Sequence, residues 1–272
     1  QLLFLFVSMI TAILILYFFN LEKLRVFNTW LVYLAILMLL FVLVKGNTIK
    51  GATRQIDLFG VVSFQPSFFA RVALVFFFAS VLDKKNDTLL LVKKPLDFLK
   101  EFPELIVLTA VVFGLIIAGR HLSTLIIGGM TLLGMLTYAG IRKRLLMIVL
   151  VLGLLGGIGI IKLGADYRMD RIHTYKKYSL FFKERDLSKS ADGDYQVRES
   201  LTALTSGGLF GTGIARGRAK HYYLPEARTD YIYTIIGEET GFIGAIIVFG
   251  LQCFLFFQCV KISNKQESRY LR

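Results

Sequence analysis

The chain has 272 residues, of which 55% are hydrophobic and 24 are Phe, and its mean hydropathy is +0.63. This apolar content exceeds that of an average soluble domain and excludes a disordered chain. The presence of two Cys excludes a disulfide framework. The net charge of +13 suits anionic lipid headgroups or an anionic substrate. Nucleic acid is the weaker interpretation, because no basic stretch lies on a recognisable soluble fold, and we expect no nucleic-acid partner.

The apolar residues gather in stretches long enough to cross a bilayer, which takes about 20 helical residues. Runs with few or no charged side chains predict seven membrane-spanning helices, at residues 1–21, 26–44, 63–82, 102–119, 121–141, 145–161 and 240–260. The predicted fold class is therefore all-α, a polytopic membrane helical bundle. We divide the chain into membrane helices one to six at 1–163, a large loop at 164–239, and the last membrane helix with its tail at 240–272.

Lysine and arginine are unevenly distributed between the short connections. Thirteen lie on one side and four on the other, the four being Lys45, Lys50, Arg54 and Arg120. Because cytoplasmic connections carry the excess of basic residues, the richer side is assigned to the cytoplasm. This places the N-terminus and the loop 164–239 outside and the C-terminus inside, and the loop's 12 further basic residues do not change the assignment.

The two chain ends lie close to predicted spans. Gln1 opens directly into an apolar run without a Met or a signal-peptide pattern. Arg272 follows shortly after the last span. We therefore expect a fragment that begins after a missing first helix.

The outward segment 164–239 is too long for a simple connector, and loops of this size are usually functional. Its part from 167 to 190 alternates basic and aromatic residues, which is typical of an interfacial helix lying on the membrane and is also compatible with a substrate role. Residues 194–205 predict a short helix with Asp192 or Asp194 as its N-cap and Gly207-Gly208 as its terminator.

A glycine-rich segment follows, with five Gly among residues 206–217. Its backbone N–H groups could cradle phosphate oxygens, or the segment could form a tight turn over a packed helix; the glycines alone do not separate the two. The neighbouring basic cluster favours an anion site, and it consists of Arg216, Arg218, Lys220 and Arg228.

Asp230 stands at the edge of an apolar stretch just before the last span. Partial desolvation there would raise its pKa and suit it to proton abstraction, although Asp230 could instead simply cap the following helix. Glu238 and Glu239 have a similar structural interpretation, as acids in the first turn of a helix.

Several motifs carry a family resemblance. They are Tyr195-Gln196 with Ser200, Ser-Gly-Gly-Leu-Phe-Gly-x-Gly from Ser206, Leu-Pro-Glu-Ala-x-Thr-Asp ending at Asp230, Gly-Glu-Glu-x-Gly-Phe-Ile-Gly from Gly237, Lys-Gly-Ala-Thr-Arg at 50–54, Phe-Gln-Pro-Ser at 64–67 and Gly-Arg-His-Leu-Ser-Thr at 119–124. In order, spacing and loop placement the chain resembles the SEDS family (shape, elongation, division and sporulation), whose branches include RodA and FtsW. The segment Lys220-x-x-Tyr-Leu-Pro-Glu-Ala is slightly closer to the FtsW branch, and division versus elongation stays open.

The resemblance implies about ten helices in the whole protein, so that this chain would lack the first and the last two. Two departures from the family pattern stand out. The family's Gln-Pro-Ser-Glu-x-x-Lys has Phe68 in place of Glu and Arg71 in place of Lys, which removes the partner of the cation. The family's Arg-Trp-Ile reads Arg54-Gln55-Ile56.

The resemblance further implies a glycosyltransferase of the bacterial cytoplasmic (inner) membrane that polymerises lipid II, an undecaprenyl-diphosphate-linked substrate, into peptidoglycan. Asp230 matches the family's catalytic Asp and is assigned as general base. The candidates for substrate contacts are Arg54, Arg216, Arg218, Lys220, Arg228, Gln196, Ser200 and Glu226; of the basic ones only Arg54 lies in a clear family motif, and the last three could be structural. A class B penicillin-binding protein, which is a transpeptidase, is the implied protein partner.

No resident cofactor is predicted. The residues His121, His173 and His221 are isolated in the sequence, and Cys253 and Cys259 lie within a span, which disfavours a transition-metal site. A divalent cation, Mg²⁺ or Mn²⁺, held by carboxylates and diphosphate remains an open alternative. Two other functions compete with the enzyme: a transporter that flips lipid-linked sugars, and a non-catalytic membrane scaffold that activates a penicillin-binding protein.

Overall fold

The computed structural model describes residues 2–18, 20–49, 52–58, 62–92, 94–119, 121–162, 176–178, 192–219 and 230–271. The chain separates into two compact units. Unit 1 comprises residues 1–155 together with 265–272, and unit 2 comprises residues 156–264. Each unit is described by itself below.

Unit 1 is built from helices of the length and composition that the sequence predicts. They are α1 (Leu2–Phe18), α2 (Leu21–Leu24), η1 (Arg25–Phe27), α3 (Asn28–Lys45), α4 (Pro66–Lys84), α5 (Asn86–Leu91), α6 (Pro95–Glu101), α7 (Pro103–Ala118), α8 (Leu122–Tyr138) and the first part of α9 (Lys143–Lys162). Proline occupies the first position of α4, α6 and α7, where its fixed φ and missing N–H are tolerated.

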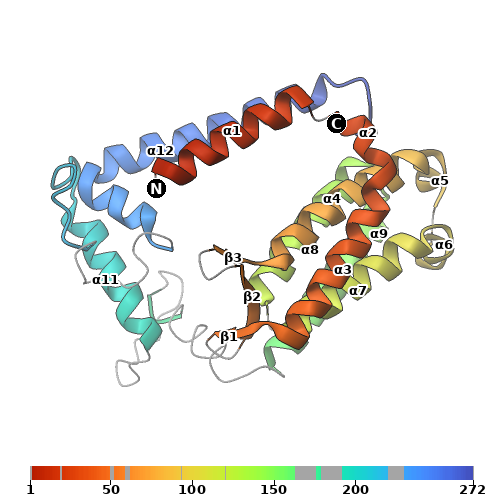
Figure 1. The fold of residues 1–272 in the computed structure, drawn as a ribbon, viewed down its shortest axis with the longest axis horizontal. Coiled ribbons are helices and arrows are strands. Elements are labelled where there is room, and N and C mark those ends of the chain that lie inside the picture. Colours follow the sequence, from red (N-terminus) through yellow and green to blue (C-terminus); the bar gives the residue numbers. More distant parts are fainter. Residues whose placement is uncertain are drawn as a thin grey trace. The chain divides into compact units, whose positions relative to one another are not determined.

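The core of unit 1 lies between α3, α4, α7 and α8, which run side by side (Figure 1). Small buried residues such as Ala35 and Ala70 allow close approach of α3 and α4, and Phe77 fills the interior beside them. The outward faces of these helices expose large apolar side chains, for example Met130 at 70%. Such an apolar surface suits lipid rather than water, so the chain is a membrane protein.

The number of spans is only partly defined by the helices. Among the described residues, three helical stretches are long and apolar enough to cross a membrane by length and composition, namely Glu22–Lys45, Pro66–Lys84 and Ile232–Asn264. The helices α6 and α7 bend by 91° at their junction, and α8 is among the shorter apolar helices. The all-α class is thus confirmed, whereas the count of seven spans stays a prediction.

Three short strands add to the predicted helices. The strands β1 (Asn47–Ile49), β2 (Ala52–Leu58) and β3 (Val62–Phe64) form an antiparallel sheet between α3 and α4. Their register is irregular between Asn47 and Thr48, which pair with Gln55 and Thr53. Arg54 is therefore the extra residue of a β-bulge, a feature that often re-aims a side chain next to a functional site.

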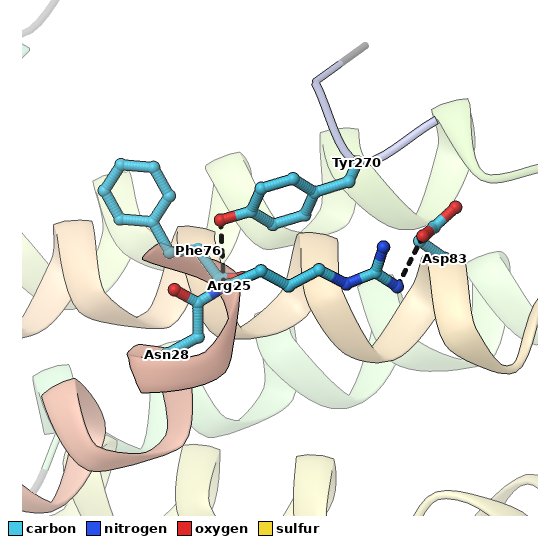
Figure 2. Close-up of polar contacts among 5 residues, drawn as sticks. All are labelled: Arg25, Asn28, Phe76, Asp83 and Tyr270. Atoms are coloured by element: carbon cyan, nitrogen blue, oxygen red, sulfur yellow. Dashed lines mark hydrogen bonds and ion pairs between the residues drawn. The ribbon is translucent and has the colours of Figure 1, made fainter. Parts of the chain in front are cut away.

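A polar cluster secures the segment 265–272 to unit 1 (Figure 2). Asn28 is buried at the start of α3, and its Nδ2 donates hydrogen bonds to the Phe76 carbonyl and to the Tyr270 hydroxyl, both at 2.9 Å. The Arg25 guanidinium lies 5.4 Å from the centre of the Tyr270 ring and pairs with Asp83 at 2.5 Å. The segment after the last helix is thus held by one buried aromatic residue.

Unit 2 contains α11 (Asp192–Ser206), which packs against α12 (Ile232–Asn264). The predicted short helix at 194–205 and its end before Gly207 are confirmed, but α11 begins at Asp192. Asp192 and Asp194 therefore lie inside the helix, and the prediction of either as its N-cap is wrong. Helix α12 begins at Ile232, inside the segment 164–239 that the sequence assigned to the loop, and non-helical dihedrals at Gly241 interrupt it.

Candidate functional site

The candidate site of unit 2 is built around the break in α12. Gly241 has φ 71° and ψ −172°, a conformation open to glycine and strongly disfavoured for other residues. A break of this kind removes helical hydrogen bonds on both sides, which leaves carbonyl groups before it and N–H groups after it without helical partners. Buried backbone groups need replacements, so another segment must supply them.

The glycine-rich segment 207–219, hereafter the glycine loop, supplies these partners. The N–H of Thr212 donates to the Glu238 carbonyl at 2.9 Å, and the N–H of Gly213 donates to the Glu239 carbonyl at 3.0 Å. The Thr212 hydroxyl also donates to the Glu238 carbonyl, at 3.0 Å. After the break, the N–H groups of Phe242 and Ile243 donate to the carbonyls of Gly208 and Leu209, at 2.9 and 3.3 Å. The glycine loop therefore forms hydrogen bonds with α12 on both sides of the break.

This close approach explains two of the loop's glycines. A Cβ on Gly211, which has φ +83°, would come within 2.7 Å of the Gly241 nitrogen and still closer to the Glu239 carbonyl. A Cβ on Gly217 would come within 2.8 Å of the Glu238 carboxylate. Of the two interpretations of the glycine-rich segment, the tight turn over a packed helix is the one observed. The N–H groups of Thr212 and Gly213 bond to α12, so these two groups are not available to a phosphate.

Glu238 is the buried acid of the site, with 3% of its surface exposed. Its Oε1 accepts a hydrogen bond from the N–H of Arg218 at 2.7 Å, and its Oε2 accepts one from the N–H of Ala219 at 3.2 Å. Because α12 begins at Ile232, the expectation that Glu238 lies in the first turn of a helix is wrong. The sequence does not reveal this role, because the partners are backbone groups of a distant loop.

The segment held by Glu238 presents two cations. Arg216 and Arg218 are exposed, whereas Gly217 and Ala219 between and after them are buried. In this segment the two exposed arginines are separated by a buried glycine. Within the described residues neither arginine forms an ion pair. We call Arg216 and Arg218 the arginine edge.

Asp230 is exposed and lies in a turn just before α12. The N–H of Ile235 donates to the Tyr231 carbonyl at 3.2 Å, which places Tyr231 rather than Asp230 at the cap position. Among the described residues the Asp230 carboxylate forms no hydrogen bond or ion pair. Asp230 is exposed, so the described residues do not bury its carboxylate.

The other predicted residues of this region differ in position. Gln196 is half-buried on α11. Ser200 is buried, and its hydroxyl donates to the Val197 carbonyl of the same helix at 2.8 Å. This favours a structural role for Ser200 over a contact with substrate. Lys220, Glu226 and Arg228 lie outside the described residues, as do most of residues 167–190.

Unit 1 brings together two motifs that are far apart in the sequence. Nδ1 of His121 lies 3.0 Å from Nε2 of Gln65 and 3.1 Å from Oγ of Ser67, and Gln65 also donates to Ser67 at 3.0 Å. The side chains of Ser67 and His121 are buried. His121 is therefore not isolated, and the prediction missed the contact because it joins the starts of α4 and α8, which only packing brings together.

Arg71 has lost the acidic neighbour that the family pattern would place at position 68. Its guanidinium carbon lies 5.6 Å from the centre of the Phe68 ring, so an aromatic face replaces a carboxylate. Phe68 itself is 51% exposed. Arg71 lies in the second turn of α4, near one end of the helix rather than at its middle.

The described residues contain no group of three or more His, Cys, Asp or Glu that could hold a metal ion. Cys253 and Cys259 of α12 are free thiols.

Comparison with known proteins identifies the family of the chain. The model of the FtsW/RodA/SpoVE family, described as "Cell cycle protein", matches residues 1–272. The chain is 31% identical over 239 residues to a probable peptidoglycan glycosyltransferase FtsW of Geobacter sp. (strain M18), covering 87% of this chain and 60% of that protein. It is 31% identical over 232 residues to the probable FtsW of Escherichia coli O6:H1, covering 85% of this chain and 52% of that one. The chain thus spans less than two thirds of these relatives.

Two solved structures share the fold. One is a chain from work on the structural coordination of polymerization and crosslinking by a peptidoglycan synthase complex; it has a TM-score of 0.70 at 20% identity and covers 100% of this chain and 71% of that one. The other is the crystal structure of the Thermus thermophilus rod shape determining protein RodA, with a TM-score of 0.61 at 20% identity, covering 97% and 66% of the two chains. At this identity the likeness establishes the fold.

Proposed function

The chain belongs to the FtsW/RodA/SpoVE family, and from this premise we propose that the protein is a peptidoglycan glycosyltransferase. In this proposal it polymerises lipid II into glycan strands on the outer side of a bacterial cytoplasmic membrane. The naming of the curated relatives as probable FtsW favours a role in cell division over one in elongation.

The single observation that carries the proposal is the position of Asp230. It is an exposed carboxylate without a partner among the described residues, and it lies in the same compact unit as the arginine edge. A base must be free to accept a proton, and cations must be free to meet an anionic leaving group. Both requirements are met by residues of unit 2.

The reaction assigns a role to each group. The Asp230 carboxylate takes the proton of a sugar hydroxyl on the acceptor, whose oxygen forms a bond to the anomeric carbon of the donor. The bond from that carbon to the diphosphate breaks, and the diphosphate leaves with the electron pair. The guanidinium groups of Arg216 and Arg218 stabilise the negative charge on the leaving group, which is the transition-state interaction that accelerates the step.

The remaining predicted residues have subordinate roles. Arg54, at the bulge of β2, is proposed as a further contact to the diphosphate. Lys220 and Arg228 continue the basic sequence beside the arginine edge, while Gln196 and Glu226 are proposed to contact sugar or peptide groups. A divalent cation, Mg²⁺ or Mn²⁺, could assist only if the diphosphate supplied most of its ligands, because the described residues contain no cluster of three ligating side chains.

The placement in the membrane is part of the proposal. The loop 164–239 with its arginine edge faces outward, where lipid II presents its headgroup, and the segment 265–272 faces the cytoplasm. The proposed protein partner is a class B penicillin-binding protein, which crosslinks the strands that this protein makes. The likeness to a chain of a peptidoglycan synthase complex supports this choice.

The test is polymerisation of purified lipid II by the complete protein in detergent, together with a partner whose transpeptidase serine is substituted. We expect Asp230→Asn and Asp230→Ala to lower the rate by about 10²–10⁴-fold, which is the usual contribution of a general base. Asp97→Asn, a change of another exposed acid in α6, should leave the rate unchanged. Full activity of Asp230→Ala would refute the base assignment.

Two assays separate the enzyme from its rivals. A scaffold would produce no glycan in the polymerisation assay, because a transpeptidase partner does not polymerise lipid II. A flippase would also produce no glycan there, but would move lipid II across the membrane of vesicles. The position of Arg71 in the second turn of α4 disfavours transport, because transporters concentrate ionisable residues near the middle of their spans.

A further inference from the structure

We propose that Glu238 is a positioning residue, which holds the backbone of residues 218–219 so that Arg216 and Arg218 stay available to a diphosphate. The inference rests on the proposed function, since it takes the diphosphate of a lipid-linked sugar as the ligand of the arginine edge. It assigns Glu238 no contact with the substrate. Its action is exerted through the two arginines.

The Glu238 carboxylate bonds to backbone groups and not to a basic side chain. A buried carboxylate beside a basic segment would ordinarily pair with a guanidinium. Here both carboxylate oxygens accept backbone N–H groups instead, from Arg218 at 2.7 Å and from Ala219 at 3.2 Å. The acid therefore fixes the chain without occupying the cations, and the described residues contain no ion pair to Arg216 or Arg218.

Residues 216–219 place buried residues next to exposed arginines. Gly217 and Ala219 are buried against Glu238, and a Cβ at Gly217 would come within 2.8 Å of its Oε2. Arg216 and Arg218 alternate with them and are exposed. The two arginines carry like charges two positions apart in the chain, and the buried carboxylate of Glu238 offsets their repulsion. The arrangement suits an external anion that bridges both guanidinium groups.

Glu238 is itself fixed by hydrogen bonds of its backbone. The carbonyl of Glu238 accepts the N–H and the hydroxyl of Thr212, at 2.9 and 3.0 Å. The same residue thus binds the glycine loop at Thr212 through its backbone and at Arg218 through its side chain. Local rigidity of this kind lowers the ordering cost of binding an anion.

The experiment measures binding of undecaprenyl diphosphate to the complete protein in detergent micelles, with undecaprenol as the uncharged probe. Glu238→Gln keeps one acceptor oxygen and the size of the side chain, so the variant is expected to fold. Loss of one hydrogen bond and of the charge should weaken diphosphate binding about tenfold. Glu199→Gln on α11, an acid bonded only to its neighbour Arg198 among the described residues, is the matched control and should bind as the wild type does.

A second background separates positioning from a merely structural role. In the Arg216→Ala/Arg218→Ala protein, Glu238→Gln should cause no further loss of diphosphate binding, because the groups through which it acts are gone. An equal loss in both backgrounds, or no loss in the wild-type background, would overturn the inference. If the wild type binds the diphosphate no better than undecaprenol, the arginine edge is not the site and the inference also fails. If coupling is found but lipid II is not polymerised, the inference stands and the proposed function fails.

Discussion

The N–H of Arg218 donates a 2.7 Å hydrogen bond to Oε1 of Glu238, twenty residues further along the chain. This bond joins the basic end of the glycine loop to the turn of α12 that precedes its break at Gly241. Loop and helix therefore form one structural element, in which each satisfies the backbone groups of the other.

The fit of the glycine loop predicts that Gly211→Ala is destabilising. The new Cβ would meet the backbone of Glu239 and Gly241, and φ at this position is +83°. Overpacking and backbone strain together should lower the free energy of unfolding by about 2–5 kcal/mol. Thermal unfolding in detergent measures the effect. Gly134→Ala in α8, where a Cβ meets nothing within 4 Å, is the control and should be neutral or slightly stabilising.

The cluster around Tyr270 predicts a graded response to substitution. Tyr270→Phe removes the hydroxyl that accepts from buried Asn28, which should cost about 1–3 kcal/mol. Tyr270→Ala also removes the ring that lies beside Arg25 and should cost more. Tyr17→Phe, at a residue 81% exposed, should have no effect on thermal unfolding. Equal stability of all three variants would contradict a structural role for the cluster.

The contact between Arg71 and Phe68 predicts that an acid is tolerated at position 68. Phe68 is 51% exposed and lies one turn before Arg71, so Phe68→Glu would exchange a cation–π contact for an ion pair. The change in stability should stay within about 1 kcal/mol. Phe69→Glu is the matched control, because Phe69 packs against the core of unit 1, and burial of its charge should cost several kcal/mol. Similar damage from both would argue against the contact.

The contact between Gln65 and His121 predicts energetic coupling between the starts of α4 and α8. In a double-mutant cycle with Gln65→Leu and His121→Phe, the two effects on stability should differ from additivity by about 0.5–3 kcal/mol. The pair Gln65→Leu and Thr137→Val should be additive, because the Thr137 hydroxyl bonds only within its own helix among the described residues. Additivity in both cycles would show that the cluster carries no coupling.

The proposed topology predicts which side of the membrane each connection faces. In a background with Cys253→Ser and Cys259→Ser, a Cys replacing Phe210 in the glycine loop should react with a membrane-impermeant maleimide in intact cells. Phe210 is 81% exposed, so access within the protein is not limiting. A Cys replacing Arg142, between α8 and α9, should react only after permeabilisation. The opposite pattern would reverse the orientation.

The sequence by itself determined the fold class of this protein, through the lengths of its apolar runs and through local motifs. Apolar runs of the right length predicted the helices, because a bilayer leaves backbone groups no partner outside the segment. The short helix α11 followed from its acidic start and glycine end, which are local signals. The motifs around Asp230 and Gly237 indicated the family before any contact was known.

Only the tertiary structure decided how the site is held. The glycine-rich segment was compatible with an anion cradle or a tight turn, and the hydrogen bonds from Thr212 and Gly213 to α12 show that it makes a tight turn over a packed helix. The role of Glu238 and the meeting of Gln65 with His121 likewise depend on residues distant in sequence. The type of a residue determines which hydrogen bonds it can form, but tertiary packing determines its partner. The backbone groups left free by the break at Gly241 therefore bond to the segment that the fold brings beside them.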